Sequence, residues 1–390
     1  MDRILTTHVG SLIRPPDLVT FLRAKDRGEP YDEEAFAACL KRSVADVARR
    51  QAEIGIDLVS DGEFGKSLSW SRYVRERLGG FTEKESTGPQ AAEGEAVFPG
   101  TDKSLFGEFY AEYDKTQGLT GSLSNWVCTG PVRYVGHAAL QRDIDDLKAA
   151  IAGLDVVDGF LPVVAPASVV PVRRDEFYDS EEDFVFAVAD ALNTEYASIV
   201  DAGLVVQIDD AYLPTMYDTM GSPEDLSEYR AWAELRIEAL NRALQGIPSE
   251  RSRYHVCWGS WNAPHVGDVA LRDIIDLILR VNVGGYSIEQ ANPRHEHEWR
   301  VWEEVRLPEG RMLLPGVVSH VTNVVEHPEL VAQRLERLAR LVGPENVIAS
   351  TDCGFAQGPF VRRVHPTIMW AKLEALVEGA RLASRRLAAA

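Results

Sequence analysis

Residues 181–208 read EEDFVFAVADALNTEYASIVDAGLVVQI, in which a long helix-like run passes directly into a short β-rich one. The pattern predicts an amphipathic helix over Glu181–Ala202, because its apolar side chains recur at three- and four-residue spacing, and a strand over Leu204–Ile208. The same alternation continues in both directions along the chain. It is typical of a parallel sheet covered by helices.

Nine β-rich runs and several helical patterns carry this alternation. The candidate strands are Ile4–Thr7, Asp57–Ser60, Val127–Gly130, Phe160–Val164, Leu204–Ile208, Tyr254–Trp258, Gly285–Glu289, Met312–Val318 and Val347–Ser350. The helical patterns include Glu33–Ile54, Glu181–Ala202, Leu226–Gln245, Leu271–Val281, Pro328–Val342 and His365–Ala388. We therefore predict an α/β fold, a single (β/α)8 TIM barrel that forms one domain over residues 1–390, with at least one run in an insertion or wrongly assigned. A doubly wound fold is the alternative, but no Gly-x-Gly-x-x-Gly follows the first strand to favour it.

Residues 83–126 interrupt the alternation. They are rich in Gly, Ser and Glu, as in TEKESTGPQAAEGEAVFPG over residues 82–100. A stretch of this length without a clear helical pattern is more often functional than idle. We expect an excursion that passes over the barrel.

Composition and charge narrow the class of protein. Hydrophobic residues make up 45% of the 390-residue chain and charged residues 26%, as in an ordinary globular protein with a large core. The net charge is −19, and no run of Lys and Arg is longer than a pair, which argues against nucleic acid as a partner. An anionic substrate stays compatible with this charge, because the potential inside a site can oppose the net charge.

The amino-terminal run MDRILTTHVGS lacks the basic and apolar segments of a secretory signal. No stretch reaches the roughly 18 apolar residues of a membrane span, so we expect no membrane association. Cys39, Cys128, Cys257 and Cys353 are then expected to be reduced thiols or metal ligands. These features predict a cytoplasmic protein. Its oligomeric state, a homo-oligomer included, is left open.

The run RYHVCWG holds the strongest chemical signal. Side chains two apart on a strand point the same way, about 6.6 Å apart along the backbone. His255 and Cys257 can therefore reach one ion at Zn–N and Zn–S distances of about 2.0 and 2.3 Å. Taken alone, the pair is equally compatible with a core strand that carries an incidental histidine.

Two later strand ends favour a metal site. Glu289 ends the run GGYSIE, and Cys353 follows the run VIAS in TDCGF. In a parallel barrel the carboxyl ends of the strands meet at one face, where active sites lie. His255, Cys257, Glu289 and Cys353 thus converge in a four-ligand set that suits Zn²⁺.

An ordered series of short motifs extends this interpretation. THVGS, DLVSDGEFGKS, TGPV, VVQIDD, HVC, SIE and STDCG follow one another from Thr7 to Gly354. Together they resemble the catalytic carboxyl-terminal barrel of the cobalamin-independent methionine synthase family, whose short single-barrel relatives include epoxyalkane:coenzyme M transferase-like proteins. The resemblance implies that His255, Cys257, Glu289 and Cys353 match the family's zinc ligands.

The resemblance also implies a site for an amino acid thiol. Ser11 matches the position whose backbone holds the carboxylate of the amino acid, and Glu63 and Asp209 match the acids that bind the homocysteine ammonium. Acids gathered at strand ends suit an amino group for a general reason as well, since ionised partners make the stronger hydrogen bonds. Asp210 either supports Asp209 or binds water. Acidic loop decoration is the alternative for this group.

The sequence also departs from the family pattern. His137 replaces a tryptophan expected after TGPV, and Thr215 replaces an acid expected after Asp209, which puts the folate site in doubt. The family's acid histidine corresponds to His320 with an offset of one residue. In the segment ANPRHEHEW, Arg294 is a candidate partner for an anionic substrate group, with a solvated loop as the alternative.

These residues predict a zinc-dependent enzyme that binds a small thiol and an alkyl donor. Zinc lowers the pKa of the thiol, whose thiolate is the nucleophile, and His320 would protonate the leaving nitrogen. The first hypothesis is methyl transfer to homocysteine to form methionine. The alternative is the opening of an epoxide by a thiol such as coenzyme M, whose sulfonate would use Arg294 or Lys66. A zinc storage protein and a porphyrinogen-decarboxylase-like enzyme explain fewer of these residues.

Overall fold

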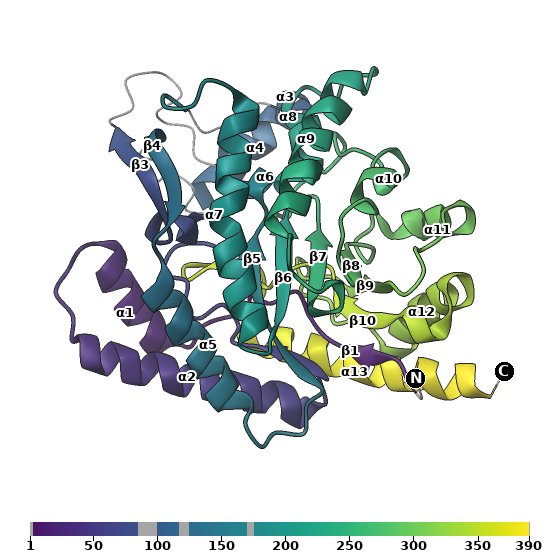
Figure 1. The fold of residues 1–390 in the computed structure, drawn as a ribbon. Helices are drawn as coiled ribbons and strands as arrows, with labels where there is room; N and C mark the ends of the chain where they lie inside the picture. Colours follow the sequence, from purple (N-terminus) through teal and green to yellow (C-terminus); the bar gives the residue numbers. More distant parts are fainter. Residues whose placement is uncertain (1–2, 85–99, 117–124, 170–174, 390) are drawn as a thin grey trace.

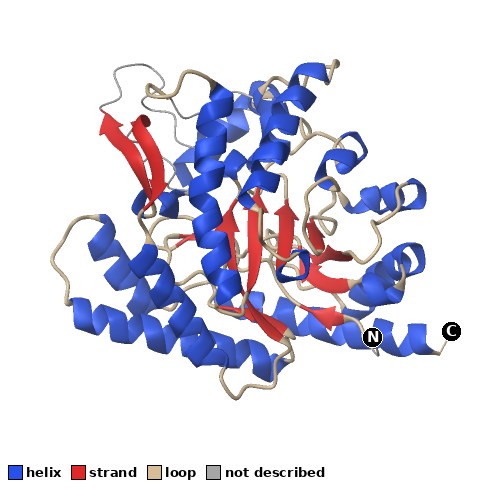
Figure 2. Ribbon diagram, viewed as in Figure 1, coloured by secondary structure: helices blue, strands red, loops and turns tan. Residues whose placement is uncertain are grey.

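A computed structural model describes residues 3–84, 100–116, 125–169 and 175–389. Eight parallel strands form one sheet in the order β1-β10-β9-β8-β7-β6-β5-β2, which curls into a nearly closed barrel with helices around it (Figures 1 and 2). The strands are β1 (Leu5–Thr6), β2 (Leu58–Ser60), β5 (Asp158–Val164), β6 (Val205–Asp210), β7 (Ser252–Val256), β8 (Gly285–Ile288), β9 (Met312–Val318) and β10 (Ile348–Thr351). The predicted (β/α)8 barrel is confirmed.

Asp57 joins β1 to β2, the two ends of the sheet order. Its backbone N–H donates to the Thr6 carbonyl oxygen at 3.1 Å, and its carboxylate accepts from the Thr6 N–H at 2.8 Å. The Arg3 guanidinium binds the same carboxylate at 2.5 and 2.7 Å. One aspartate therefore takes the place of part of a strand ladder at this seam.

Thirteen α-helices are found in the described residues. They are α1 (Pro16–Asp26), α2 (Glu33–Ile54), α3 (Thr101–Leu105), α4 (Gly107–Thr116), α5 (His137–Ile151), α6 (Pro166–Val169), α7 (Glu181–Asp201), α8 (Tyr212–Thr219), α9 (Ser227–Ala243), α10 (Ile275–Ile278), α11 (Val301–Glu304), α12 (Pro328–Val342) and α13 (Pro366–Ala388). The predicted helix over Leu271–Val281 is wrong in extent. A 3₁₀ turn and the four-residue α10 occupy it, because the backbone of Ile274 at φ −131° leaves the helical region.

Local sequence explains where the longest helices begin and end. Asp32 and Ser180 cap α2 and α7, each with a side-chain oxygen that accepts a backbone N–H three residues later. Gly55 ends α2 in the left-handed region at φ 94°, which costs glycine little. The alternating elements therefore begin and end close to where the pattern places them.

The ninth candidate strand belongs to the insertion. Val127–Gly130 lies within β4 (Asn125–Tyr134), which pairs antiparallel with β3 (Leu78–Lys84) in a hairpin beside α7 and outside the barrel (Figure 1). Phe81 and Trp126 stack across the hairpin with ring centroids 3.7 Å apart. The predicted excursion also contains α3 and α4, and its residues 85–99 and 117–124 lie outside the described part of the chain.

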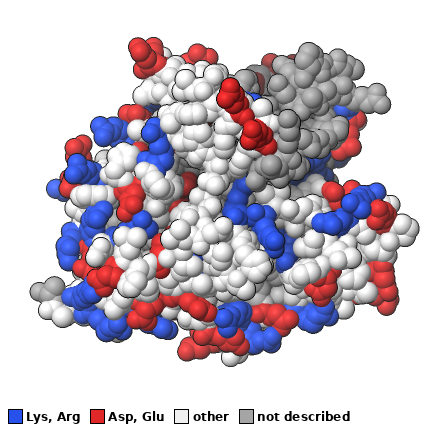
Figure 3. Space-filling view, turned by 180° about the vertical axis from the view of Figure 1, so that it is seen from behind, with Lys and Arg blue, Asp and Glu red and all other residues white. Residues whose placement is uncertain are grey.

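Charged side chains of both signs are interspersed over the face seen in Figure 3. Within the described residues, none of the helices combines the length and the apolar character that crossing a bilayer requires.

Candidate active site

A cavity of about 420 Å³ opens at the carboxyl ends of the barrel strands, between the loops that follow β1, β2, β6, β7 and β10. Helices α3, α4 and α8 supply further lining residues. Six of the residues singled out from the sequence line it: Ser11, Glu63, Asp209, His255, Cys257 and Cys353. A concave site with converging polar groups is the usual form of a small-molecule site.

Three of the predicted metal ligands come together in this cavity. The Sγ atoms of Cys257 and Cys353 lie 3.6 Å apart, and one nitrogen of His255 lies within 4.8 Å of both. The Nδ1 atom of His255 is 3.1 Å from the Ser287 hydroxyl, while its buried Nε2 has no hydrogen-bond partner among the described residues. The hydrogen bond with Cys353 and burial raise the pKa of Cys257 well above its usual value.

These distances suit zinc. Two thiolates at Zn–S distances of about 2.3 Å and a tetrahedral angle stand about 3.8 Å apart, close to the separation found here. Buried polar atoms are rarely left without a partner in proteins. The imidazole nitrogen of His255, which has none among the described residues, is therefore a candidate for the third donor to the metal.

Glu289, the fourth predicted ligand, lies beside this group. Its carboxylate accepts hydrogen bonds from the backbone N–H of Trp258 at 3.1 Å and from the Asn292 side chain at 2.6 Å. Ligand atoms of Glu289, His320 and Asp352 form a second buried group within 4.8 Å of one another. Three of the four predicted ligands therefore lie together, whereas Glu289 belongs to the neighbouring group with His320 and Asp352.

Glu63 and Asp209 form an acidic corner of the cavity. Glu63 has a left-handed backbone at φ 61°, in the turn that follows β2, and Asp209 lies near the carboxyl end of β6. Burial, followed by the negative charge of Glu63, raises the pKa of Asp209 well above its usual value. Lys66 opposes this effect, and its Nζ lies 3.3 Å from the carboxylate of Glu63. Lys66, a candidate partner for a sulfonate in the sequence analysis, is buried.

Ser11 lies near the start of the chain, whereas the loop that contacts it lies near the end. Its hydroxyl donates to the Ala356 carbonyl oxygen, and its own carbonyl oxygen accepts from the Phe355 N–H at 2.8 Å. Gly354 packs so closely here that a Cβ atom at that position would stand 2.7 Å from the Cβ of Ser11. These contacts connect Ser11 to the loop that carries Cys353.

Two predicted substrate residues lie outside the lining. The Asp210 carboxylate accepts from the Ser168 hydroxyl at 2.9 Å, the Leu213 N–H at 3.1 Å and the Tyr254 hydroxyl at 2.9 Å. Arg294 is exposed and donates to the Val266 carbonyl oxygen at 3.0 Å. Asp210 therefore supports the start of α8, and Arg294 ties two loops together.

His320, the predicted acid, is buried and does not line the cavity. Burial lowers its pKa well below the usual value, and the cation of Arg363 adds to this, while a contact with the Ser260 backbone opposes it. Neither ring nitrogen forms a well-aligned hydrogen bond within the described part of the chain. Its ligand atom lies within 4.8 Å of those of Glu289 and Asp352, in the second buried group.

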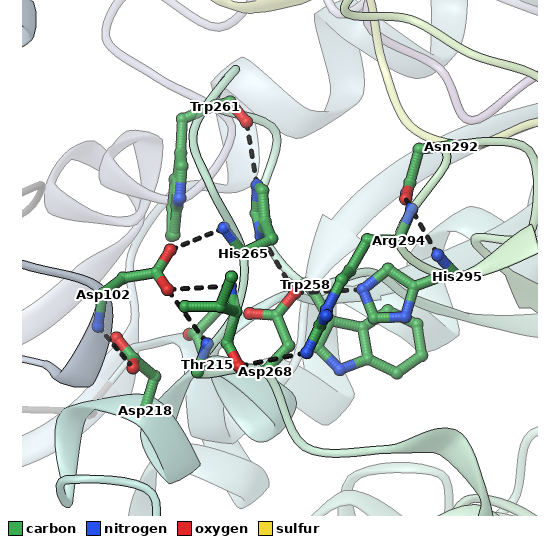
Figure 4. A network of polar contacts seen from close by, with 12 residues as sticks. Asp102, Thr215, Asp218, Trp258, Trp261, His265, Asp268, Asn292, Arg294 and His295 are labelled. Carbon is green, nitrogen blue, oxygen red and sulfur yellow. Dashed lines mark hydrogen bonds and ion pairs between the residues drawn. The ribbon is translucent and has the colours of Figure 1, made fainter. Parts of the chain in front are cut away.

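The loop of residues 259–268, which follows Cys257, was missed by sequence reasoning. It lines the cavity with Trp261, His265 and Asp268, among others. The Asp102 carboxylate of α3 accepts three successive backbone N–H groups of this loop, at residues 265, 266 and 267, from 2.5 to 2.9 Å (Figure 4). No short motif marks this contact, because its partners lie more than 160 residues apart in the sequence.

Two histidines share the Asp268 carboxylate (Figure 4). The Oδ2 atom of Asp268 lies 2.9 Å from Nδ1 of His265 and 3.0 Å from Nε2 of His295. Burial acts to lower the pKa of both rings, but the hydrogen bonds to carboxylates outweigh it and raise the pKa to about 9 for His265 and about 10 for His295. His295 also stacks on Trp258, with ring centroids 4.0 Å apart.

Known proteins are similar to this chain over most or all of its length. Residues 169–378 match the family model described as cobalamin-independent synthase, catalytic domain. Methionine synthases of Thermococcus kodakarensis and Saccharolobus solfataricus are each 25% identical, over 98% of this chain and 94% and 95% of their own lengths. A B12-independent methionine synthase from Shewanella sp. W3-18-1, solved with selenomethionine, superposes with a TM-score of 0.72 at 19% identity and covers 100% of both chains.

Proposed function

Since this chain belongs to the cobalamin-independent methionine synthase family, a methyltransferase family of methionine biosynthesis, we propose that it transfers an alkyl group to the sulfur of a small amino acid thiol, with methyl transfer to homocysteine as the first candidate. The observation that carries the proposal is that Cys257, Cys353 and a His255 nitrogen with no hydrogen-bond partner among the described residues meet two buried acids in one cavity. A thiol and an amino group would each find their partners there.

His255, Cys257 and Cys353 are the proposed protein ligands of Zn²⁺, with Glu289 as the fourth. When bound, the metal supplies a lowered thiol pKa and a fixed position for the sulfur. Glu289 would have to exchange its hydrogen bonds with Trp258 and Asn292 for this role. The Ser287 hydroxyl lies 3.1 Å from Nδ1 of His255, so Nε2 would be the nitrogen that binds the metal.

Glu63 and Asp209 are the proposed partners of the substrate ammonium. When both carboxylates are ionised, they and the Lys66 ammonium together carry one negative charge, which one substrate cation would neutralise. Buried charges of this kind are stable only when paired, so a zwitterionic amino acid suits the corner better than a neutral thiol. Ser11 would present its backbone to the substrate carboxylate.

The structure offers less support for a sulfonate thiol such as coenzyme M. Arg294 lies outside the cavity lining, and Lys66 is engaged by Glu63. The epoxide as alkyl donor stays compatible, because the residues described here recognise the thiol and leave the donor unspecified. The proposed role of His320 as the acid derives from the family resemblance.

Calorimetry on the zinc-loaded protein tests the proposal. Homocysteine, cysteine and coenzyme M would be titrated in two buffers of different ionisation enthalpy. We expect homocysteine to bind and to release about one proton, because a thiol that becomes a metal ligand is deprotonated. Binding of coenzyme M with no binding of homocysteine would contradict the amino acid assignment.

A further inference from the structure

We propose that His265 is the group that protonates the leaving atom of the alkyl donor, an inference that rests on the proposed alkyl transfer. His265 lies in the 259–268 loop and lines the same cavity as Cys257 and Cys353. Its side chain keeps 16% of its surface exposed, so a ligand in the cavity can reach it. His320, the residue that the family resemblance suggests, is not part of this lining.

Hydrogen-bond geometry sets the charge of the His265 ring. Nδ1 lies 2.9 Å from a carboxylate oxygen of Asp268, and Nε2 lies 2.9 Å from the carbonyl oxygen of Trp261. Both partners are acceptors, so both ring nitrogens must carry hydrogen. His265 is therefore an imidazolium. Its Nε2 proton is donated to a neutral carbonyl oxygen, which is a weaker partner than the carboxylate that accepts the Nδ1 proton.

The surroundings of His265 are suited to keep and restore this proton. Asp268 also binds His295, whose other nitrogen lies 2.8 Å from the Glu298 carboxylate, so His295 must be doubly protonated as well. The two cations and two carboxylates balance in charge. When His265 gives up a proton, Asp268 remains paired with His295 and is not left as an uncompensated buried charge.

The backbone of His265 is held in an unusual conformation. Its φ of 57° lies in the left-handed region, which side chains with a Cβ rarely occupy. Three hydrogen bonds to Asp102 hold the turn, and the His265 and Trp261 rings lie parallel, 9° apart. Strained residues that the surrounding structure holds in place are concentrated at functional sites.

The Nε2 proton of His265 can neutralise the departing atom of either class of alkyl donor, whether that atom is nitrogen or oxygen. The thiolate sulfur forms a bond to the donor carbon while the bond from that carbon to nitrogen or oxygen breaks, and the electron pair stays on the departing atom. That atom takes the proton from Nε2 of His265. The imidazole is left neutral, with its Nδ1–H still donated to Asp268, and water in the cavity returns a proton to Nε2.

Two alkylating reagents separate this role from a structural one. The protein, loaded with zinc and homocysteine, would be reacted in single turnovers with methyl iodide, whose iodide needs no proton, and with 1,2-epoxypropane, whose ring oxygen does. General acids contribute about 10²- to 10⁴-fold, so we expect His265→Asn to slow the epoxide reaction by about 100-fold or more and the iodide reaction by less than about twofold.

His320→Asn is the matched comparison. A selective loss with the epoxide in His320→Asn, or equal losses with both reagents in His265→Asn, would overturn the assignment. Failure of the unmodified protein to alkylate homocysteine with either reagent would instead overturn the proposed function and this inference with it.

A second measurement does not depend on metal or activity. In the metal-free protein with ¹⁵N-labelled histidine, NMR should show His265 with both ring nitrogens protonated at neutral pH, assigned by its disappearance in His265→Asn. The groups that face it are Asp268 on its own loop, Asp102 on α3, Glu289 after β8, His295 and His320. With these groups in place the ring should lose its Nε2 proton near pH 9. A neutral ring at pH 7 would overturn the proposal.

Discussion

The two walls of the cavity are built in different ways. One wall, which we call the metal wall after the zinc ligands proposed for it, comes from the barrel itself, because His255 lies in β7, Cys257 follows it directly and Cys353 comes two residues after β10. The facing loop, residues 259–268, is held by partners from elsewhere, chiefly Asp102 of α3 and the His295 ring. A parallel sheet sets the position of the first wall, whereas the second depends on side chains that bind backbone amides and one another.

Because the two walls are held in different ways, the residues of one wall can change while the other wall is retained. Strand ends in a barrel converge whatever the loops do, so a thiol-activating centre can persist while the donor side changes. Thr215 and Asp102 line the cavity but are not part of the group formed by His255, Cys257 and Cys353. If the two walls are independent, substitutions in one should leave the other unchanged.

Loss of a metal-wall thiol should have the largest effect. We expect Cys257→Ser and Cys353→Ser to abolish stoichiometric zinc binding, because two of the three clustered donors are thiolates. Metal analysis after dialysis measures this, with Cys39→Ser in α2 as the control that removes a buried thiol elsewhere. Full zinc in both site variants would exclude the proposed centre.

Removal of one acid should weaken thiol binding and leave the metal in place. Hydrogen bonds to charged groups contribute about 1.5–3 kcal/mol, so Asp209→Asn should weaken homocysteine binding by roughly 10- to 150-fold. Asp210→Asn is the matched control, since its carboxylate contacts Ser168 and Tyr254 outside the cavity lining. Equal weakening in both variants would show that the effect is structural.

Release of the facing loop should be smaller and local. Asp102→Ala removes the acceptor of three backbone N–H groups, and about 1.4 kcal/mol corresponds to a tenfold change in an opening equilibrium. We expect hydrogen exchange at residues 265–267 to accelerate by about tenfold or more, with zinc content unchanged. Loss of zinc in this variant would mean that the two walls are coupled.

The pH dependence of stability tests the charge assigned to His295 beside the facing loop. The pKa of His295 is raised to about 10 in the folded protein, so its contribution is fully present below its unfolded pKa near 6.5 and is lost as the pH rises through about 10. We expect His295→Asn to flatten the decline in unfolding free energy between pH 7 and 10, as measured with urea.

His297→Asn is the control for this measurement, because this neighbouring ring is exposed. An unchanged decline in His295→Asn would contradict the assigned charge.

The chain itself determined the barrel and the residues that its strands carry. Helix and strand periods are local, so α12 over Pro328–Val342 and the strand that bears His255 could be predicted without a structure. The proximity of Cys257 and Cys353 could be predicted because parallel strand ends share one face, and in the structure their sulfurs lie 3.6 Å apart.

The contacts and orientations of the remaining side chains follow from tertiary packing and could not be predicted from the sequence. This packing turned Glu289 toward Trp258 and Asn292, placed Asp210 and Arg294 outside the cavity, and brought Asp102 to the loop of His265. These outcomes depend on rotamers, burial and contacts between residues far apart in the chain, which carry no period and no motif. Spacing along a chain therefore specifies which strand end a residue occupies, and packing decides what its atoms can touch.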